Sequence, residues 1–281
     1  MVQSKDNIRA VIEAEGAYVV PVEEEETHPR ISIVIPLHNE QGTIREVIER
    51  IPDYLNAEII VVDDGSTDGS AQKAQEARRE IKVVRHERNQ GYGAALLTGF
   101  KHASGDIIVT MDSDGQHRPE EIPNFIAPIL KKKADVVVGS RYLGTCNFKV
   151  PLYTRLGEFC INKSLWLLYR QKVGNNQNGF RAYHKRVFPI FNRLQSNGMG
   201  IGTEILFSAA HHGFRIMEMP MTAEPRAFGL SYVNVLRVFK TIISILLIYM
   251  IKRVNFGPKN TLFYRTGFRT IEFFKQKGFI Y

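Results

Sequence analysis

Short apolar runs alternate with amphipathic stretches from residue 31 onward. The apolar runs are rich in Val and Ile, and each has the length of one strand: 31–36, 58–62, 81–85, 106–111 and 134–139. The stretches between them carry apolar residues at helical spacing: 43–55, 69–80, 92–103 and 119–132. Strands that are apolar throughout are typical of a parallel sheet covered on both faces. The pattern therefore predicts an α/β fold with a doubly wound, mostly parallel central sheet flanked by helices.

The two ends of the chain differ from this central part. Residues 1–30 contain one short helical pattern, at about 5–15, and an acidic run at 23–26, so we expect an N-terminal appendage without chemistry. Residues 31–235 form the predicted α/β domain. Residues 236–281 are apolar and basic, and beyond residue 251 seven Lys or Arg stand against one Glu. We expect amphipathic helices in this C-terminal segment.

Polar residues and glycines follow every predicted strand. These exits are "LHNE", "DDGSTD", "HERNQGYG", "DSDGQH" and "SRY", at 37–40, 63–68, 86–93, 112–117 and 140–142. The carboxyl ends of parallel strands meet at one edge of a sheet, and ligands bind there in α/β proteins. The sequence therefore predicts a single binding site built from these exits.

Two pairs of aspartates lie in these exits. Asp68 suits the role of N-cap for the next predicted helix, so capping does not account for Asp63 and Asp64. We therefore expect one of these two aspartates to accept hydrogen bonds from a nucleotide. Asp112 and Asp114 are separated by one residue, and Gln116 is one further. In an extended segment these three side chains face the same way. Hard oxygen ligands suit Mg²⁺ or Mn²⁺, whereas the alternative is a pair of surface turn aspartates.

The formal net charge of +8 favours anionic partners such as nucleotide phosphates or an anionic membrane surface. No recognised motif supports binding of nucleic acid. The Gly-x-Gly of residues 91–93 lacks the third glycine of a nicotinamide site. Cys146 and Cys160 match no zinc or redox spacing, so we interpret them as reduced cysteines of a cytosolic protein.

The longest strongly apolar run, "TIISILLIYMI" at 241–251, has basic residues on both sides. It is shorter than the roughly 20 residues that a spanning helix needs. An apolar stretch with cationic ends suits a helix that lies in the headgroup region of a membrane. We therefore expect peripheral attachment to the inner, cytoplasmic face of the cell membrane. The alternative is a helix buried in the core or in an oligomer.

These motifs together resemble the family 2 glycosyltransferases of the GT-A fold. The resemblance is carried by "ISIVIPLHNE", "VVDDGSTDGS", "RNQGYGAALLTGF" and "MDSDGQH". The segments "DSDGQHRPEEIP", "VVVGSRYL", "NQNGFRAY" and "EPRAFGLSY" are similar to the polyprenyl-phosphate hexosyltransferases, which include the dolichyl-phosphate mannose and glucose synthases. The resemblance covers about residues 31–235, which would then be a GT-A catalytic domain.

The resemblance implies roles for matched residues. The nucleotide sugar would contact Pro36, Asn39, Glu40, Asp63, Asp64, Gly91, Asp112, Ser113 and Asp114. The cofactor, Mg²⁺ or Mn²⁺, would be held by Asp112, Asp114 and Gln116. The acceptor phosphate would be bound by Arg141, Arg181, Arg226 and Ser231. The catalytic set would be Asp114, Arg141, Glu204 and Arg226.

Two positions depart from related sequences. Tyr232 stands where the related loop has a lysine, so this loop has one phosphate contact fewer. The single tryptophan, Trp166, is not in the Gln-x-x-Arg-Trp motif of processive polysaccharide synthases, so we do not expect a processive polymerase.

The implied reaction is an inverting transfer of a hexose from a UDP-hexose or GDP-mannose to a polyprenyl phosphate such as dolichyl phosphate. A phosphate monoester is already largely ionised near neutral pH and needs little help from a general base. Two alternatives stay open. One is a family 2 enzyme with a glycan or protein hydroxyl as acceptor, for which Glu204 is the candidate base. The other is a non-catalytic protein that binds nucleotide sugars. The sequence leaves the donor and the oligomeric state open.

Overall fold

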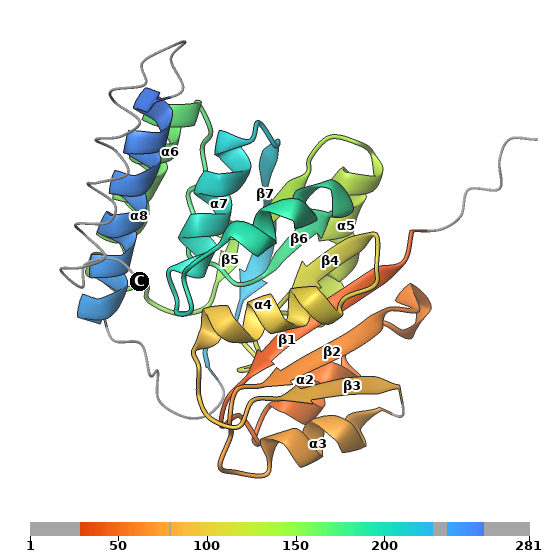
Figure 1. Cartoon of the computed structure of the whole chain (residues 1–281). Helices are drawn as coiled ribbons and strands as arrows, with labels where there is room; N and C mark the ends of the chain where they lie inside the picture. The colour runs from red at the N-terminus through yellow and green to blue at the C-terminus, as the bar shows by residue number, and fades with distance from the viewer. Residues whose placement is uncertain (1–28, 79, 227–234, 256–281) are drawn as a thin grey trace, which may run out of the picture.

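A computed structural model describes residues 29–78, 80–226 and 235–255 of the protein. The predicted N-terminal helix and the basic tail beyond residue 255 lie outside the described residues. The described part contains a central sheet with helices on both faces (Figure 1). The predicted fold class is therefore confirmed.

The sheet has seven strands in the order β3-β2-β1-β4-β6-β5-β7. The strands are β1 (Ile31–Leu37), β2 (Glu58–Asp63), β3 (Ile81–Arg85), β4 (Ile107–Thr110), β5 (Val136–Cys146), β6 (Arg181–His184) and β7 (Ile216–Ala223). The pairs among β1, β2, β3 and β4 are parallel, and β5 pairs with β7 in parallel. β6 is antiparallel to both of its neighbours, β4 and β5.

Helices cover both faces because the strands are apolar on both sides. One core joins the sheet to α2 (Ile44–Glu49), α3 (Ser70–Ala77) and α5 (Ile122–Leu130). The other joins it to α4 (Tyr92–His102), α6 (Leu152–Tyr169), α7 (Ile201–His211) and α8 (Val235–Asn255). Successive β1 residues alternate between these cores: Ile33 and Ile35 belong to the first and Val34 to the second. This is the burial expected of a central strand.

Three short 3₁₀ segments complete the described secondary structure: η1 (Asp53–Leu55), η2 (Pro119–Glu121) and η3 (Lys185–Arg193). Two of them shorten predicted helices. The helix expected over 43–55 ends at Glu49, and Pro52 precedes η1. The helix expected over 119–132 is divided into η2 and α5. In the first case the cause is the missing N–H and fixed φ of proline, which interrupt a continuous helix.

The order of strands differs from the simplest arrangement of five parallel neighbours. β5 does not pair with β4, because β6 lies between them and hydrogen-bonds to both. The "RAYH" of β6 is too short and too polar to have stood out as a strand. β5 also extends beyond the predicted residue 139 to Cys146, with an irregularity in its pairing with β7 between Ser140 and Thr145.

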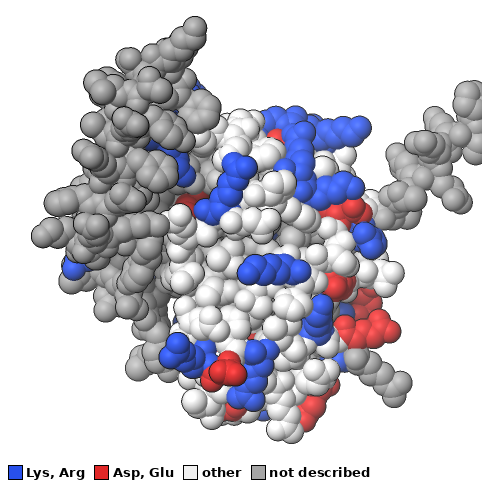
Figure 2. All heavy atoms as spheres, in the orientation of Figure 1, with Lys and Arg blue, Asp and Glu red and all other residues white. Residues whose placement is uncertain are grey.

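α8 contains the apolar run of residues 241–251 and packs against α6 and α7 (Figure 1). Its Ile245 and Tyr249 are buried in the second core, while Phe239, Ile243 and Met250 are exposed. Among the described helices, none has the length and hydropathy that crossing a bilayer would require. On the face seen in Figure 2, Lys and Arg are interspersed with neutral and acidic residues and do not form one continuous basic stripe.

Candidate active site

A cavity of about 680 Å³ lies at the carboxyl ends of the strands. Its wall includes residues from the ends of β1 and β2, the start of α4, the loop after β4, and strand β5. Ten residues predicted for the site line it: Pro36, Glu40, Asp64, Gly91, Asp112, Ser113, Asp114, Gln116, Arg141 and Arg226. The parallel strands thus bring together side chains that are up to 190 positions apart in the chain, from Pro36 to Arg226.

Asp112 is held in place from three sides. The Tyr92 hydroxyl donates to Asp112 Oδ1 at 2.8 Å, and His117 Nε2 lies 3.7 Å from Oδ2. The Asp112 backbone N–H donates to His117 Nδ1 at 3.1 Å, so the neutral imidazole carries its hydrogen on Nε2, toward the carboxylate. Gly179 closes the third side, because a Cβ there would lie 2.5 Å from Asp112 Oδ1.

Asp114 and Glu40 form the second anionic part of the cavity. Burial and the neighbouring charge of Asp112 raise the pKa of Asp114. His117 and the hydrogen bond from the Gln116 N–H, at 3.0 Å, oppose this rise. Burial raises the pKa of Glu40 as well, although its hydrogen bond from the Arg226 guanidinium opposes the shift. Arg226 Nη1 also lies 3.7 Å from Asp114 Oδ2. Among the described residues, four carboxylates and two arginines line the cavity.

Asp64 organises the loop that precedes α4. Its carboxylate accepts hydrogen bonds from the backbone N–H groups of Gln90 and Gly91, both at 2.8 Å. His86 Nδ1 donates to the same carboxylate at 2.7 Å, and His86 Nε2 lies 2.9 Å from Thr98 Oγ1. Gly91 has a φ of +104°, a conformation that glycine adopts without strain. Asp64 thus shapes this wall of the cavity through the backbone.

Arg141 reaches the cavity from β5. Its Nη2 donates to Glu158 Oε1 on α6 at 2.8 Å, and Tyr142 donates to the other oxygen of that carboxylate. The Arg141 side chain is 16% exposed, so most of its guanidinium is enclosed by protein. The cavity therefore places a cation on the wall formed by β5, apart from the one that Arg226 supplies.

This geometry can be compared with known proteins. Residues 32–191 match the sequence profile of glycosyl transferase family 2. The chain belongs to this family. It is 36% identical to a dolichol-phosphate mannosyltransferase of Pyrococcus furiosus, over 72% of this chain and 58% of that protein. It is 30% identical to a UDP-N-acetylglucosamine–dolichyl-phosphate N-acetylglucosaminyltransferase of Methanococcus voltae, over 78% of this chain and 96% of that protein.

The fold of this family 2 glycosyltransferase also occurs in solved structures. Glucosyl-3-phosphoglycerate synthase from Mycobacterium tuberculosis, crystallised with Mn²⁺, UDP and phosphoglyceric acid, superposes with a TM-score of 0.61. The two chains are 21% identical, and the match covers 83% of this chain and 80% of that one. At this level of identity the likeness concerns the fold. The GT-A resemblance seen in the sequence is thereby confirmed.

The donor set at Asp112 and Asp114 fits a hard divalent cation. The two carboxylates line one cavity, and burial and the charge of Asp112 raise the pKa of Asp114, so the ionised Asp114 is disfavoured without a cation. Gln116 lines the same cavity, but its Nε2 donates to the Glu224 carbonyl at 3.2 Å. Within residues 29–78, 80–226 and 235–255, no three His, Cys, Asp or Glu residues converge on a metal position. A cation here would take its remaining ligands from substrate phosphates and water, as Mg²⁺ usually does.

Four predicted site residues do not line the cavity of the glycosyltransferase, and two of them support its turns. Asp63 accepts the Ser66 N–H at 2.9 Å and lies 3.0 Å from Arg85 Nε. Asn39 has a φ of +54°, and its Oδ1 accepts the Thr67 N–H at 2.8 Å. The nucleotide contacts of both side chains stay predictions; in this structure the two side chains hold the loops after β1 and β2 together.

Arg181 and Glu204 are buried in structural roles. The Arg181 guanidinium donates to three backbone carbonyls, at 2.7 Å to Asn178, 2.7 Å to Gly202 and 2.8 Å to Asn176. Three carbonyls satisfy a buried cation that is 2% exposed. Its contact with an acceptor phosphate stays a prediction.

The Glu204 carboxylate accepts the backbone N–H of Gln195 at 3.1 Å and that of Ser196 at 2.9 Å. It anchors the loop of residues 196–200, which does line the cavity, whereas Glu204 itself does not. The role of Glu204 near the sugar stays a prediction; in this structure its carboxylate is bound to backbone N–H groups. Ser231 lies outside the described residues.

The sequence prediction missed Tyr92, His117 and Glu158. Tyr92 and His117 stand inside quoted motifs, "GYG" and "GQH", but their contacts with Asp112 depend on where α4 and the loop after β4 lie in the fold. Burial and the charge of Asp112 raise the pKa of Tyr92, which keeps its hydroxyl protonated as a donor. Glu158 gave no signal at all, because nothing in the sequence places the middle of α6 beside β5.

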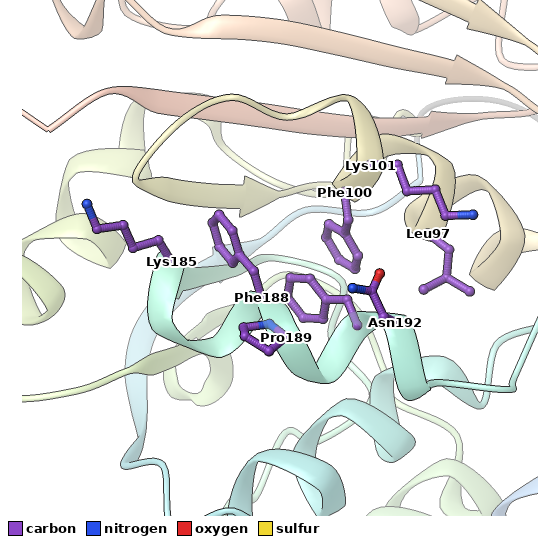
Figure 3. Close-up of a pocket in the computed structure, with 8 residues that line it drawn as sticks. Leu97, Phe100, Lys101, Lys185, Phe188, Pro189 and Asn192 are labelled. Atoms are coloured by element: carbon purple, nitrogen blue, oxygen red, sulfur yellow. The ribbon is translucent and has the colours of Figure 1, made fainter.

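A second hollow, of about 420 Å³, lies between α4 and η3 (Figure 3). Phe100, Phe188 and Pro189 form part of its apolar wall, and Lys101 and Lys185 also line it. Lys185 is paired with Asp106 at 2.9 Å. None of the predicted site residues lines this hollow.

Proposed function

We propose that this family 2 glycosyltransferase moves a hexose from a nucleotide sugar to a polyprenyl phosphate such as dolichyl phosphate, with Mg²⁺ or Mn²⁺ as cofactor. The donor would be a UDP-hexose or GDP-mannose. The observation that carries the acceptor class is the placement of Glu204. The candidate base for a hydroxyl acceptor is bound to backbone N–H groups outside the cavity, whereas two arginines line it.

The other carboxylates that line the cavity already have assigned partners. Asp64 accepts three hydrogen bonds from the protein, and Glu40 is paired with Arg226. Asp112 and Asp114 form the proposed cation site. An ionised phosphate attacks without giving up a proton, so a cavity whose described carboxylates all have assigned partners suits a phosphate acceptor better than a hydroxyl.

The reaction is a direct displacement at the anomeric carbon, in which an acceptor phosphate oxygen forms the new bond as the nucleoside diphosphate departs. Asp112 and Asp114 would hold the cation, which neutralises charge on the leaving diphosphate. Arg226 supplies a second cation beside Asp114, at 3.7 Å. Arg141 on the β5 wall orients the acceptor phosphate by charge-assisted hydrogen bonds. The work of this chain is positioning and charge stabilisation. The names of the relatives from Pyrococcus and Methanococcus support this assignment.

A membrane surface is the place where a polyprenyl phosphate is available, and α6 and α8 expose apolar faces suited to it. On α6, Leu152 is 80% exposed, Leu156 62% and Leu167 66%. Lys163 Nζ lies 5.3 Å from the Phe159 ring centroid on the same helix. Apolar and aromatic side chains with cations among them favour the interface of an anionic membrane. We place the protein on the inner, cytoplasmic face of the cell membrane.

The test is a panel of UDP-glucose, UDP-N-acetylglucosamine and GDP-mannose, each with farnesyl phosphate and Mn²⁺, with the glycolipid identified by mass spectrometry. We expect one donor to yield a farnesyl phosphate glycoside and farnesol to yield none. Transfer to farnesol or to sugar hydroxyls, with farnesyl phosphate inert, would favour the hydroxyl-acceptor alternative. No turnover of any donor would favour a nucleotide-sugar-binding protein without catalysis.

A further inference from the structure

Glu158 is a buried carboxylate that no step above uses. It lies on α6, is 2% exposed and does not line the cavity. One carboxylate oxygen accepts from Arg141 Nη2 at 2.8 Å, and the other accepts from the Tyr142 hydroxyl. Asn176 Nδ2 donates to the Glu158 backbone carbonyl at 2.8 Å, which ties this turn of α6 to the loop before β6. Both carboxylate oxygens of Glu158 therefore have fixed partners.

Arg141 is held by this contact but is not fully satisfied. Its Nε is buried and has no hydrogen-bond partner among the described residues. A buried N–H without a partner costs free energy, so native proteins rarely keep one without a reason. Asn175, which also lines the cavity and donates to the Gly139 carbonyl of β5 at 3.2 Å, likewise has a buried, unpartnered Oδ1. Among the described residues this part of the structure thus holds one buried donor and one buried acceptor without a partner.

We propose that Glu158 is the positioning residue for Arg141: it holds the guanidinium at the β5 wall so that the terminal N–H groups not bound to Glu158 face the acceptor phosphate. This inference rests on the proposed function and deepens it. A phosphate presents several acceptor oxygens to one guanidinium, and two parallel bonds fix its orientation. The carboxylate also balances the charge of a largely enclosed arginine, which would otherwise turn toward solvent.

Tyr142 contributes by binding the second carboxylate oxygen of Glu158. A carboxylate with one partner can rotate about its terminal torsion, whereas the Tyr142 hydroxyl on the other oxygen prevents this. Arg141 Cζ lies 5.5 Å from the Tyr142 ring centroid, so the same tyrosine also contacts the arginine. Burial raises the pKa of Glu158, and the hydrogen bond from Tyr142 and the charge of Arg141 oppose this shift and favour the ionised form.

The position of Glu158 on α6 has a consequence for lipid binding. The buried residues of α6 are Glu158, Ile161 and Leu165, while Leu156 and Leu167 on its other side are exposed. One helix thus carries the face proposed to meet the membrane and the carboxylate that orients the phosphate-binding arginine. The headgroup phosphate would then bind to Arg141, whose position is set by Glu158 on the same helix that contacts the lipid.

The experiment measures binding of farnesyl phosphate and of farnesol to the full chain by calorimetry. The variants are Glu158→Gln, Arg141→Ala and the double variant. Glu76→Gln is the matched control, because Glu76 pairs with Arg45 at 2.8 Å and does not line the cavity. We expect Glu158→Gln to lower the affinity for farnesyl phosphate about tenfold, because one oriented charge-assisted interaction is lost. The affinity for farnesol should not change. The double variant should bind no more weakly than Arg141→Ala alone.

Kinetics supply the second readout. Glu158→Gln should raise the KM for farnesyl phosphate about tenfold and leave the KM for the donor within about twofold, because the donor does not depend on Arg141. Wild-type affinity for farnesyl phosphate in Glu158→Gln overturns the proposal, and so do additive losses in the double variant. A wild-type protein that does not prefer farnesyl phosphate over farnesol overturns it as well. If the binding results hold but no sugar is transferred, the proposed function fails and the positioning role stands.

Discussion

Gly179 lies two residues before β6. Because it has no side chain, it leaves room for the Asp112 carboxylate. A Cβ at this position would lie 2.5 Å and 2.6 Å from the two carboxylate oxygens of Asp112 and 2.6 Å from the Tyr92 hydroxyl. Ordinary contacts of this kind are about 3.4 Å or longer, so Gly179→Ala requires the carboxylate to move by about 0.9 Å. The carboxylate is the mobile end of a side chain, so the movement costs activity more than stability.

The magnitude follows from how steeply reactions depend on position. Displacement of a catalytic group by about 1 Å can lower the rate by about 100-fold, which is about 2.7 kcal/mol of transition-state stabilisation. We therefore expect Gly179→Ala to lower kcat/KM for the donor by about 100-fold. The apparent affinity for Mn²⁺, measured by titration of activity and by calorimetry, should fall with it. The melting temperature should change by only a few degrees.

The control is Gly157→Ala on α6, where a Cβ would meet nothing within 4 Å. This substitution should leave kcat/KM unchanged and favour the helix by up to about 1 kcal/mol. Wild-type kcat/KM and Mn²⁺ affinity in Gly179→Ala would refute the reasoning, because Asp112 would then tolerate a displacement that the geometry makes unavoidable. Unfolding of Gly179→Ala at ambient temperature would refute the separation of activity from stability.

Three further predictions concern other parts of the site and the fold. Arg181→Met should lower the free energy of unfolding by at least about 3 kcal/mol in chemical denaturation, because three buried carbonyls lose their donor; unchanged stability would contradict this. Asp64→Asn should raise the donor KM at least about tenfold in steady-state kinetics, since the N–H groups of Gln90 and Gly91 lose a charged acceptor; a change confined to the acceptor KM would contradict it. Burial would raise the pKa of Asp135, but hydrogen bonds from the side chain and backbone of Arg215 outweigh it and lower the pKa. Asp135 therefore stabilises the fold above its unfolded pKa of about 3.9, and this contribution is lost as pH falls through the lower folded pKa. Unfolding free energies of wild type and Asp135→Asn should differ at pH 7, and the gap should close only as pH falls from about 3.9 through the lower folded pKa. A gap that persists below that range would contradict the assignment.

The sequence by itself determined that the chain forms a central sheet and that the candidate site lies at the carboxyl edge of this sheet. Runs such as 31–36 and 58–62 are apolar on both faces, and such runs are stable only between two layers of helices. The strand exits then had to meet at the carboxyl edge, which is why the position of Asp112 and Asp114 directly after a strand was enough to assign them to one site. Local pattern suffices here because periodicity and chain direction are properties of neighbouring residues.

Only the tertiary structure decided which polar residues face the cavity. Asp63 and Asp64 are adjacent and chemically alike, yet Asp63 binds its own turn and Asp64 lines the cavity. Arg181 and Arg141 both stand in matched motifs, but the insertion of β6 between β4 and β5 buries the first among carbonyls and leaves the second beside Glu158. The physical reason is that the partner of a charged side chain is set by contacts between segments far apart in the chain, which periodicity does not encode.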